Sequence, residues 1–421
     1  MTGRPDGEIL EGTRGALVRR WLAAAVCVMA VSACSQDSST PESATPSRGL
    51  STARSTTGPP PESEPATESA VPSPTEVPAR PTRPDTRCFG ARPTIRGTAS
   101  NDRIHATGAE DVIVTYGGND VVSGLDLFDK VCTGPGKDRV SCAVCDWIVD
   151  VDLGSGDDRI ARGGGTIRGG AGDDTILIAG GHEFYVEPGT GDDLVRAAST
   201  ARRAELVGTS CVRYGTATGP VHVNLARGHA TGQGRDRLVN IGCVVGGRFN
   251  DVLIGTDGGD SIDTGGGLNL VRAGAGDDHV TGGARADEVY AGSGADSVTG
   301  EGGWDRLYGG PGGDLLAGSS AIIADVPGAG DYVEGGAGDD YLFGGAICEY
   351  NIGPHGVSAQ DAPNELFGGP GDDGLSGEGG NDRLDGGPGV DSGQGGWRDG
   401  RIDWITSVEI YDECASPYRY R

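Results

Sequence analysis

The dominant feature of this 421-residue sequence is an aspartate that recurs every nine residues, followed two positions later by an aliphatic residue. Counted by nines, the recurring positions in one long run are Asp251, Asp260, Asn269, Asp278, Asp287, Asp296, Asp305 and Asp314. The aliphatic residues are Leu253, Ile262, Val271, Val280, Val289, Val298, Leu307 and Leu316. Because glycine-rich turns precede the acidic positions, this period predicts a solenoid of small stacked units, each contacting only its neighbours.

The same register returns in other parts of the chain. Its positions are Asp331 and Asp340, then Asn364, Asp373 and Asp382, and earlier Asp102, Asp111, Asp120, Asp129 and Asp138. Residues 148–200 keep three glycine turns, which end at Asp158, Asp174 and Asp193 and lie 16 and 19 residues apart. We therefore expect one calcium-binding edge and one irregular edge in that stretch.

A physical structure follows from this spacing. A strand of about three residues presents one aliphatic side chain to a core, and a glycine turn then reverses the chain. Two units make a coil of 18 residues, and stacked coils form two parallel sheets with the aliphatic residues between them. Aspartates 18 residues apart then form a column, so Asp260 and Asp278 share one edge while Asp251 and Asp287 share the other. Carboxylates stacked at ~4.8 Å repel one another, and calcium, a hard cation with oxygen ligands, would remove that repulsion.

The composition supports a cation-dependent fold. The chain has 78 glycines but only 6 phenylalanines and 2 methionines, so its hydrophobic core must be thin. Its 61 acidic and 34 basic residues give a formal net charge of -27, which repels nucleic acid and anionic lipid. We expect metal binding to supply much of the folding free energy.

The turns resemble the hemolysin-type calcium-binding, or RTX, nonapeptide repeats. The best matches are residues 274–280, 335–342 and 368–375, and the resemblance covers most of residues 95–395. It implies an all-β fold, a right-handed parallel β-roll or β-helix solenoid with calcium bound in the turns by the aspartate and backbone oxygens. Residues 206–255 resemble the rungs that often precede such repeats.

The register and the resemblance together predict the calcium ligands. The expected metal-binding residues are Asp102, Asp111, Asp120, Asp138, Asp158, Asp174, Asp193, Asp251, Asp260, Asp278, Asp287, Asp296, Asp305, Asp314, Asp331, Asp340, Asp373 and Asp382. Asn269 replaces an aspartate, so its site should be weaker or empty. The turn before Asp129 lacks glycine, and we expect it to bind nothing.

The N-terminus resembles a bacterial export signal. Arg14, Arg19 and Arg20 precede a short apolar stretch, and residues 31–34 resemble a lipobox in which Cys34 would be lipidated. The alternative is ordinary signal cleavage near Ala33. We expect a cell-surface protein, anchored to the membrane through that lipid.

The segments expected along the chain follow from these patterns. They are a signal peptide at residues 1–33, the anchor cysteine and a disordered Ser/Thr/Pro-rich linker at 34–87, a first repeat run at 88–147, irregular solenoid rungs at 148–245, the main β-roll at 246–395 and a C-terminal cap at 396–421. Interrupting loops are expected at 317–328 and 344–362.

Eight cysteines beyond Cys27 and Cys34 favour disulfides in an exported chain. Cys88 and Cys132 could pin the N-terminal end, Cys211 and Cys243 could link neighbouring rungs, and Cys414 could tie down the cap. Cys142 and Cys145 form a CxxC motif, which leaves a zinc or redox site as the alternative.

No catalytic motif accompanies the repeats: the sequence has no H-E-x-x-H, G-x-S-x-G or G-x-x-x-x-G-K-[ST]. We therefore predict a non-enzymatic calcium-binding protein that folds on export. One alternative is a calcium-stabilised adhesin or wall-binding module with a cell-wall or glycan ligand. The other is a polysaccharide lyase or epimerase, whose site would lie near His222, His229 and Arg227.

Overall fold

The structure, a computed structural model, describes residues 87–142, 149–179, 184–198, 210–319, 330–345, 363–377, 381–394 and 404–410. The predicted signal peptide, Cys34, the linker up to residue 86, Cys348 and Cys414 lie outside this part of the chain. None of the described residues forms an apolar helix of membrane-spanning length.

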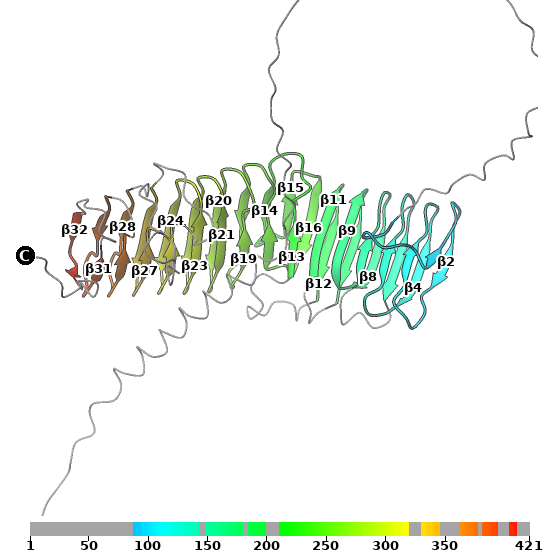
Figure 1. Ribbon diagram of the computed structural model, residues 1–421, viewed down its shortest axis with the longest axis horizontal. Coiled ribbons are helices and arrows are strands. Elements are labelled where there is room, and N and C mark those ends of the chain that lie inside the picture. The colour runs from blue at the N-terminus through cyan, green and yellow to red at the C-terminus, as the bar shows by residue number, and fades with distance from the viewer. Residues whose placement is uncertain are drawn as a thin grey trace, which may run out of the picture. The chain divides into compact units, whose positions relative to one another are not determined.

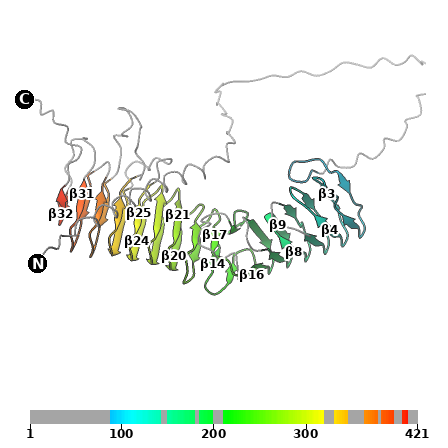
Figure 2. The same ribbon diagram turned by 90° about the horizontal axis from the view of Figure 1, so that it is seen from below.

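The described residues form two long sheets of short strands that run side by side along a β-solenoid (Figures 1 and 2). The first sheet contains, in order, β1 (Ile95–Arg96), β3 (Val112–Val114), β5 (Lys130–Cys132), β7 (Asp150–Asp152), β9 (Gly165–Ala171), β11 (Phe184–Thr190), β13 (Ser210–Arg213), β17 (Cys243–Val245), β19 (Ser261–Asp263), β21 (His279–Gly283), β23 (Ser297–Glu301), β25 (Leu315–Ala317), β27 (Tyr341–Phe343), β29 (Gly374–Ser376), β31 (Ser392–Gln394) and β33 (Glu409–Ile410). The pairings between neighbours in this sheet are parallel, as the repeat predicted.

The second sheet runs β2 (Arg103–His105), β4 (Val121–Leu125), β6 (Arg139–Cys142), β8 (Arg159–Gly163), β10 (Thr175–Ile178), β12 (Leu194–Ala197), β16 (Arg235–Val239), β15 (His229–Thr231), β14 (His222–Asn224), β18 (Val252–Ile254), β20 (Leu270–Ala275), β22 (Glu288–Ser293), β24 (Arg306–Pro311), β26 (Tyr332–Ala337), β28 (Glu365–Phe367), β30 (Arg383–Asp385) and β32 (Trp404–Thr406). In the main roll the chain alternates between the sheets, so each pair of consecutive strands makes one coil.

The 18-residue coil predicted from the sequence is confirmed by the strand register. Leu253 pairs with Val271 in the second sheet, and Ile262 pairs with Val280 in the first. The aliphatic residues of the repeat are buried between the sheets, and most of them have no exposed surface. Ile95, Ile104 and Ile405, near the two ends of the described solenoid, are partly buried. One aliphatic side chain per strand therefore makes a continuous but thin core.

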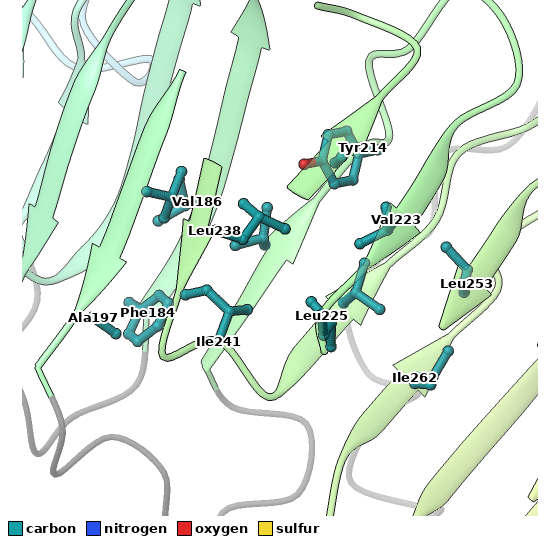
Figure 3. Close-up of a cluster of buried hydrophobic side chains, with 14 of the residues drawn as sticks. Phe184, Val186, Ala197, Tyr214, Val223, Leu225, Leu238, Ile241, Leu253 and Ile262 are labelled. Carbon is teal, nitrogen blue, oxygen red and sulfur yellow. The ribbon is translucent and has the colours of Figure 1, made fainter. Parts of the chain in front are cut away.

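The solenoid is interrupted in its middle by an antiparallel insertion. Strands β14, β15 and β16 pair antiparallel, while β16 pairs parallel with β12 and β14 pairs parallel with β18. Residues 206–255, which resemble the rungs that often precede such repeats, therefore include a three-stranded meander within the parallel sheet. The space beneath it is filled by larger side chains than elsewhere, among them Phe184 and Tyr214 (Figure 3).

Two disulfides have both cysteines within the described part of the chain. Cys88 is bonded to Cys132, and Cys211 is bonded to Cys243. The first bond lies at the N-terminal end and the second joins β13 to β17 beside the insertion. Both pairings are ones that the sequence suggested.

Candidate metal centre

Two columns of buried aspartates follow the turns at the two edges of the solenoid. We call the turns that lead into the first sheet edge 1 and those that lead into the second sheet edge 2. Edge 1 carries Asp111, Asp129, Asp260, Asp278, Asp296, Asp314, Asp340, Asp373 and Asp391; edge 2 carries Asp102, Asp120, Asp138, Asp158, Asp174, Asp193, Asp236, Asp251, Asn269, Asp287, Asp305, Asp331, Asn364 and Asp382. The predicted separation of Asp260 and Asp278 from Asp251 and Asp287 is thus observed.

One carboxylate oxygen of each aspartate binds the preceding coil. The backbone NH of Asp278 donates to Oδ1 of Asp296 at 2.8 Å, and that of Asp296 donates to Oδ1 of Asp314 at 2.9 Å. The same bond links Asp158 to Asp174 and Asp174 to Asp193, each at 2.8 Å. The ladder on edge 2 is therefore continuous from Asp158 to Asp193. Since Oδ1 is committed to this ladder, the chemistry of each site depends on Oδ2.

In one class of turn, which we call open, the Oδ2 atom is buried without a hydrogen-bond partner. Its members are Asp120, Asp138, Asp158, Asp174, Asp193, Asp278, Asp296, Asp314, Asp340, Asp373 and Asp391. A buried carboxylate oxygen with no donor is costly, because desolvation is not compensated. These atoms are therefore the expected place for a missing cation.

In a second class, which we call closed, the protein itself satisfies Oδ2. The backbone NH of the residue four positions earlier donates to it: Thr98 to Asp102 at 2.6 Å, Thr107 to Asp111 at 2.7 Å, Gly247 to Asp251 at 2.6 Å, Thr256 to Asp260 at 2.5 Å and Gly283 to Asp287 at 2.8 Å. All five were expected to be metal ligands. In Asp251 and Asp287 the other carboxylate oxygen, Oδ1, also accepts a backbone NH.

The backbone angle of that fourth residue separates the two classes. In all eleven open turns it has a positive φ, as at Gly336 before Asp340 (113°), whereas in the five closed turns it does not. With a positive φ, the NH of Gly336 continues the sheet ladder and donates to the carbonyl of Gly368 at 2.9 Å. The NH then no longer reaches the carboxylate.

Two natural asparagines indicate what the open position accepts. Asn364 occupies an aspartate position; its Oδ1 takes the NH of Asp331 at 2.8 Å, and its Nδ2 donates to the carbonyl of Gly377 at 3.2 Å. Asn269 donates in the same way to the carbonyl of Gly267 at 3.5 Å. A positively polarised group at this position thus meets backbone carbonyl oxygens, which are also calcium ligands.

Burial raises the pKa of several of the open carboxyl groups. Desolvation, reinforced by the neighbouring aspartates of the column, raises the pKa of Asp158, Asp278 and Asp340 to about 7 each. For Asp193 the same causes raise the pKa to about 8. Without a cation, these columns therefore favour protonation near neutral pH.

The residues present fit calcium. Each open turn offers one carboxylate oxygen with carbonyl oxygens beside it: an added Cβ on Gly335 would lie 2.5 Å from Oδ2 of Asp340 and 2.8 Å from the carbonyl oxygen of Gly368. Within the described residues no three His, Cys, Asp or Glu side chains gather. The rest of a coordination shell would therefore come from the backbone, which suits calcium better than magnesium.

One aspartate that the sequence did not single out receives a hydrogen bond on Oδ2 from another side chain. Asp236 continues the column, since its Oδ1 accepts the NH of Asp193 at 3.3 Å, and its Oδ2 accepts the hydroxyl of the buried Tyr214 at 3.0 Å. Its turn has positive φ angles at Gly232 and Gly234, as open turns do. The phenol thus occupies the position where other open turns have no donor.

A second missed aspartate closes the C-terminal end of edge 1. Oδ1 of Asp391 accepts the NH of Asp373 at 2.9 Å, and its Oδ2 is buried without a partner. One further step of nine from Asp382 would have found it. At Asp129, where the sequence predicts no bound ion, Oδ2 accepts the NH of Asp126 at 2.7 Å and so already has a donor.

Comparison with known proteins agrees with this geometry. A family model described as "RTX calcium-binding nonapeptide repeat (4 copies)" matches residues 94–130, 245–280, 281–316, 328–346 and 360–392. No curated protein matches the chain. The open turns at Asp278, Asp296, Asp314, Asp340 and Asp373 all lie inside the matched ranges, and this chain carries RTX calcium-binding nonapeptide repeats folded as a β-solenoid.

Proposed function

We propose that this is an exported, non-enzymatic calcium-binding β-roll protein, in which calcium ions in the open turns complete the fold. The observation that carries the proposal is the set of eleven buried Oδ2 atoms without donors. Each lies in a turn whose positive φ directs the nearest NH elsewhere. A cation would supply the missing positive partner.

The proposal also assigns calcium unevenly along the chain. The ligands would be the open aspartates, including Asp391, together with carbonyls of the same and the next turn. The closed aspartates, exemplified by Asp102 and Asp251, would bind weakly or not at all because their Oδ2 atoms are already hydrogen-bonded. Calcium, when bound, would supply positive charge between carboxylates that otherwise repel.

We expect folding to require calcium because the thin aliphatic core stabilises the fold only slightly more than the buried carboxylates destabilise it. The core contributes one aliphatic side chain per strand, so it offers little surplus against stacked, buried carboxylates. A cation bound only by the folded chain stabilises it by mass action. We expect the protein to be largely unfolded at low calcium concentration and folded at the millimolar concentrations outside cells, where extracellular calcium modules bind at roughly 10⁻⁴ to 10⁻³ M.

A location outside the cytoplasm is supported by the two disulfides and by the leader-like N-terminus. We propose a cell-surface protein anchored through Cys34. Mass spectrometry of the mature protein from membranes would test this: a diacylated N-terminal Cys34 is expected, and an unmodified N-terminus near residue 34 would refute the anchor.

A non-catalytic role agrees with the surroundings of the two histidines considered as a lyase site. His222 and His229 lie exposed on β14 and β15, and His229 pairs in register with Asn224 and Arg237. They sit on the antiparallel insertion, within strand pairs of the sheet. Incubating the protein with acidic polysaccharides and following the absorbance of unsaturated products would test this part.

The central experiment is a calcium titration of residues 85–421, the compact unit, followed by far-UV circular dichroism. We expect β-sheet signal to appear with calcium and to disappear with chelator. A magnesium titration serves as the control and should be far less effective. A fold that is complete in chelator and unchanged by calcium would overturn the switch.

A further inference from the structure

The outer face of the second sheet carries a concentration of arginines in its N-terminal half. Along β2, β4, β6, β8, β10, β12 and β16, the outward positions that alternate with the buried ones are Arg103, His105, Val121, Ser123, Arg139, Ser141, Arg159, Ala161, Thr175, Leu177, Leu194, Arg196, Arg235, Arg237 and Val239. None of these positions on the seven strands is acidic or aromatic. We call the six arginines Arg103, Arg139, Arg159, Arg196, Arg235 and Arg237 the arginine face; all six are exposed.

This arrangement is unfavourable for the fold alone. Arg139 and Arg159 are direct partners in the register of β6 and β8, so two like charges stand opposite each other at ~4.8 Å strand spacing. Neither is ion-paired within the described part of the chain. In a protein with a net charge of -27, six arginines without interspersed carboxylates are not the expected result of a merely solvated surface.

The C-terminal half of the same sheet shows the ordinary arrangement. There Arg306 is the register partner of Glu288, and Arg383 is the register partner of Glu365. Arg383 also lies over the ring of Phe367 at 4.9 Å. Arginines of this half thus have local partners, which those of the arginine face lack.

Three exposed carboxylates lie beside the arginine face, in the turns that lead into its strands. Asp157, Asp173 and Asp192 lie in the turns of edge 2, where their Oδ1 atoms accept backbone NH groups of the next coil. Asp157 is also paired with Lys137. These acids form their own ladder along the edge, so the arginines remain available on the sheet.

We propose that the arginine face binds a linear anionic polysaccharide. Six coil steps at ~4.8 Å give the face a length of about 29 Å. Arg103, Arg139, Arg159 and Arg237 share one register position along it, and Arg196 and Arg235 lie two residues to either side. Such a row suits a thin chain with repeated carboxylate or sulfate groups, because guanidinium binds these groups in a bidentate manner. Single-stranded nucleic acid would require aromatic stacking partners, which these strands do not offer.

The test is binding of the full chain, in calcium, to dextran sulfate and to uncharged dextran, with polygalacturonate as the carboxylate arm, measured by biolayer interferometry. We expect binding to at least one charged polymer, none to dextran, and weakening as salt is raised. The double variant Arg139→Gln/Arg159→Gln should lose about tenfold in affinity. The matched control Arg306→Gln/Arg383→Gln, on the other half of the sheet, should lose less than about twofold.

Several outcomes would overturn the proposal. These are equal loss in both double variants, binding to neutral dextran, tighter binding to duplex DNA than to either charged polysaccharide, or self-association that Arg139→Gln/Arg159→Gln abolishes. Circular dichroism of each variant in calcium shows whether it is folded. A failure of polymer binding by folded protein is therefore distinguishable from a failure of the calcium-dependent fold.

Discussion

Two aspartates nine residues apart offer a direct test of the distinction between open and closed turns. Asp296 and Asp287 are both buried, and each accepts a backbone NH on Oδ1. They differ at Oδ2, which has no donor in Asp296 but accepts the NH of Gly283 at 2.8 Å in Asp287. The perturbation is the same substitution, aspartate to asparagine, made separately at each position.

The expected magnitudes follow from these contacts. Asp296→Asn removes a buried charge without a partner, so the calcium-free protein should be unchanged or slightly more stable, as the natural Asn364 implies. If a site has a dissociation constant 10 to 100 times below the calcium concentration, losing it removes about 1.4–2.7 kcal/mol of calcium-induced stabilisation. Asp287→Asn places an amide NH₂ against the NH of Gly283 and should cost about 1–3 kcal/mol with or without calcium.

The assay is thermal or urea unfolding of both variants and the wild type, in chelator and in 10 mM calcium, a concentration chosen from the ~10⁻⁴ to 10⁻³ M affinities of extracellular modules. Asp296→Asn should reduce the difference between the two conditions, whereas Asp287→Asn should lower stability equally in both. If Asp287→Asn loses as much of the calcium increment as Asp296→Asn, then the hydrogen bond to Oδ2 does not distinguish the turns and the reasoning is refuted.

Three further predictions concern the same columns. First, burial raises the pKa values of Asp158, Asp174 and Asp193 from 3.8 to about 7, about 6 and about 8, so protonation favours the calcium-free fold: its melting temperature should fall as pH rises from 5 to 8, and a flat or rising profile would contradict this. Second, Tyr214→Phe deletes the donor to Asp236 and should cost about 1–3 kcal/mol in chelator, with part of the loss recovered in calcium; no recovery would mean that this turn cannot take an ion. Third, Gly335→Ala places a methyl group against Oδ2 of Asp340, so equilibrium dialysis with ⁴⁵Ca should show about one ion fewer, and unchanged stoichiometry would exclude a site there.

The sequence predicted the coil and the core because both depend on period alone. Val280 and Leu307 are buried wherever the register is kept, and the 18-residue pairing follows from two units per coil. The insertion at β14–β16 was not predicted, since its short alternating strands resemble parallel rungs until their partners are known. Pairing partners are a tertiary property that no local pattern specifies.

The class of each turn was only partly readable from the sequence. Three of the closed turns have threonine four residues before the aspartate, as at Thr98, and a β-branched residue disfavours positive φ. Gly247 and Gly283 nevertheless form closed turns, although glycine permits either conformation. In those two turns, contacts with neighbouring coils decide whether φ is positive. The residue type alone does not show which conformation is adopted.

The two disulfides lie in the parts of the chain where most Oδ2 atoms accept a hydrogen bond from the protein. This arrangement predicts which segments stay folded without calcium. The Cys88–Cys132 segment contains Asp102, Asp111 and Asp129, whose Oδ2 atoms all accept a backbone NH, and a single open turn at Asp120.

In the same way, the Cys211–Cys243 bond lies beside three satisfied carboxylates, those of Asp236, Asp251 and Asp260. The open turns dominate residues 134–193 and 265–391. Hydrogen exchange in chelator, read by mass spectrometry, should therefore show residual protection at 95–132 and 211–262 and little at 134–193 and 270–391, with protection spreading to all four segments in calcium. Uniform loss of protection in chelator would mean that hydrogen-bonded turns and disulfides do not hold their coils without the metal-dependent neighbours, and the solenoid would then fold as a single calcium-dependent unit.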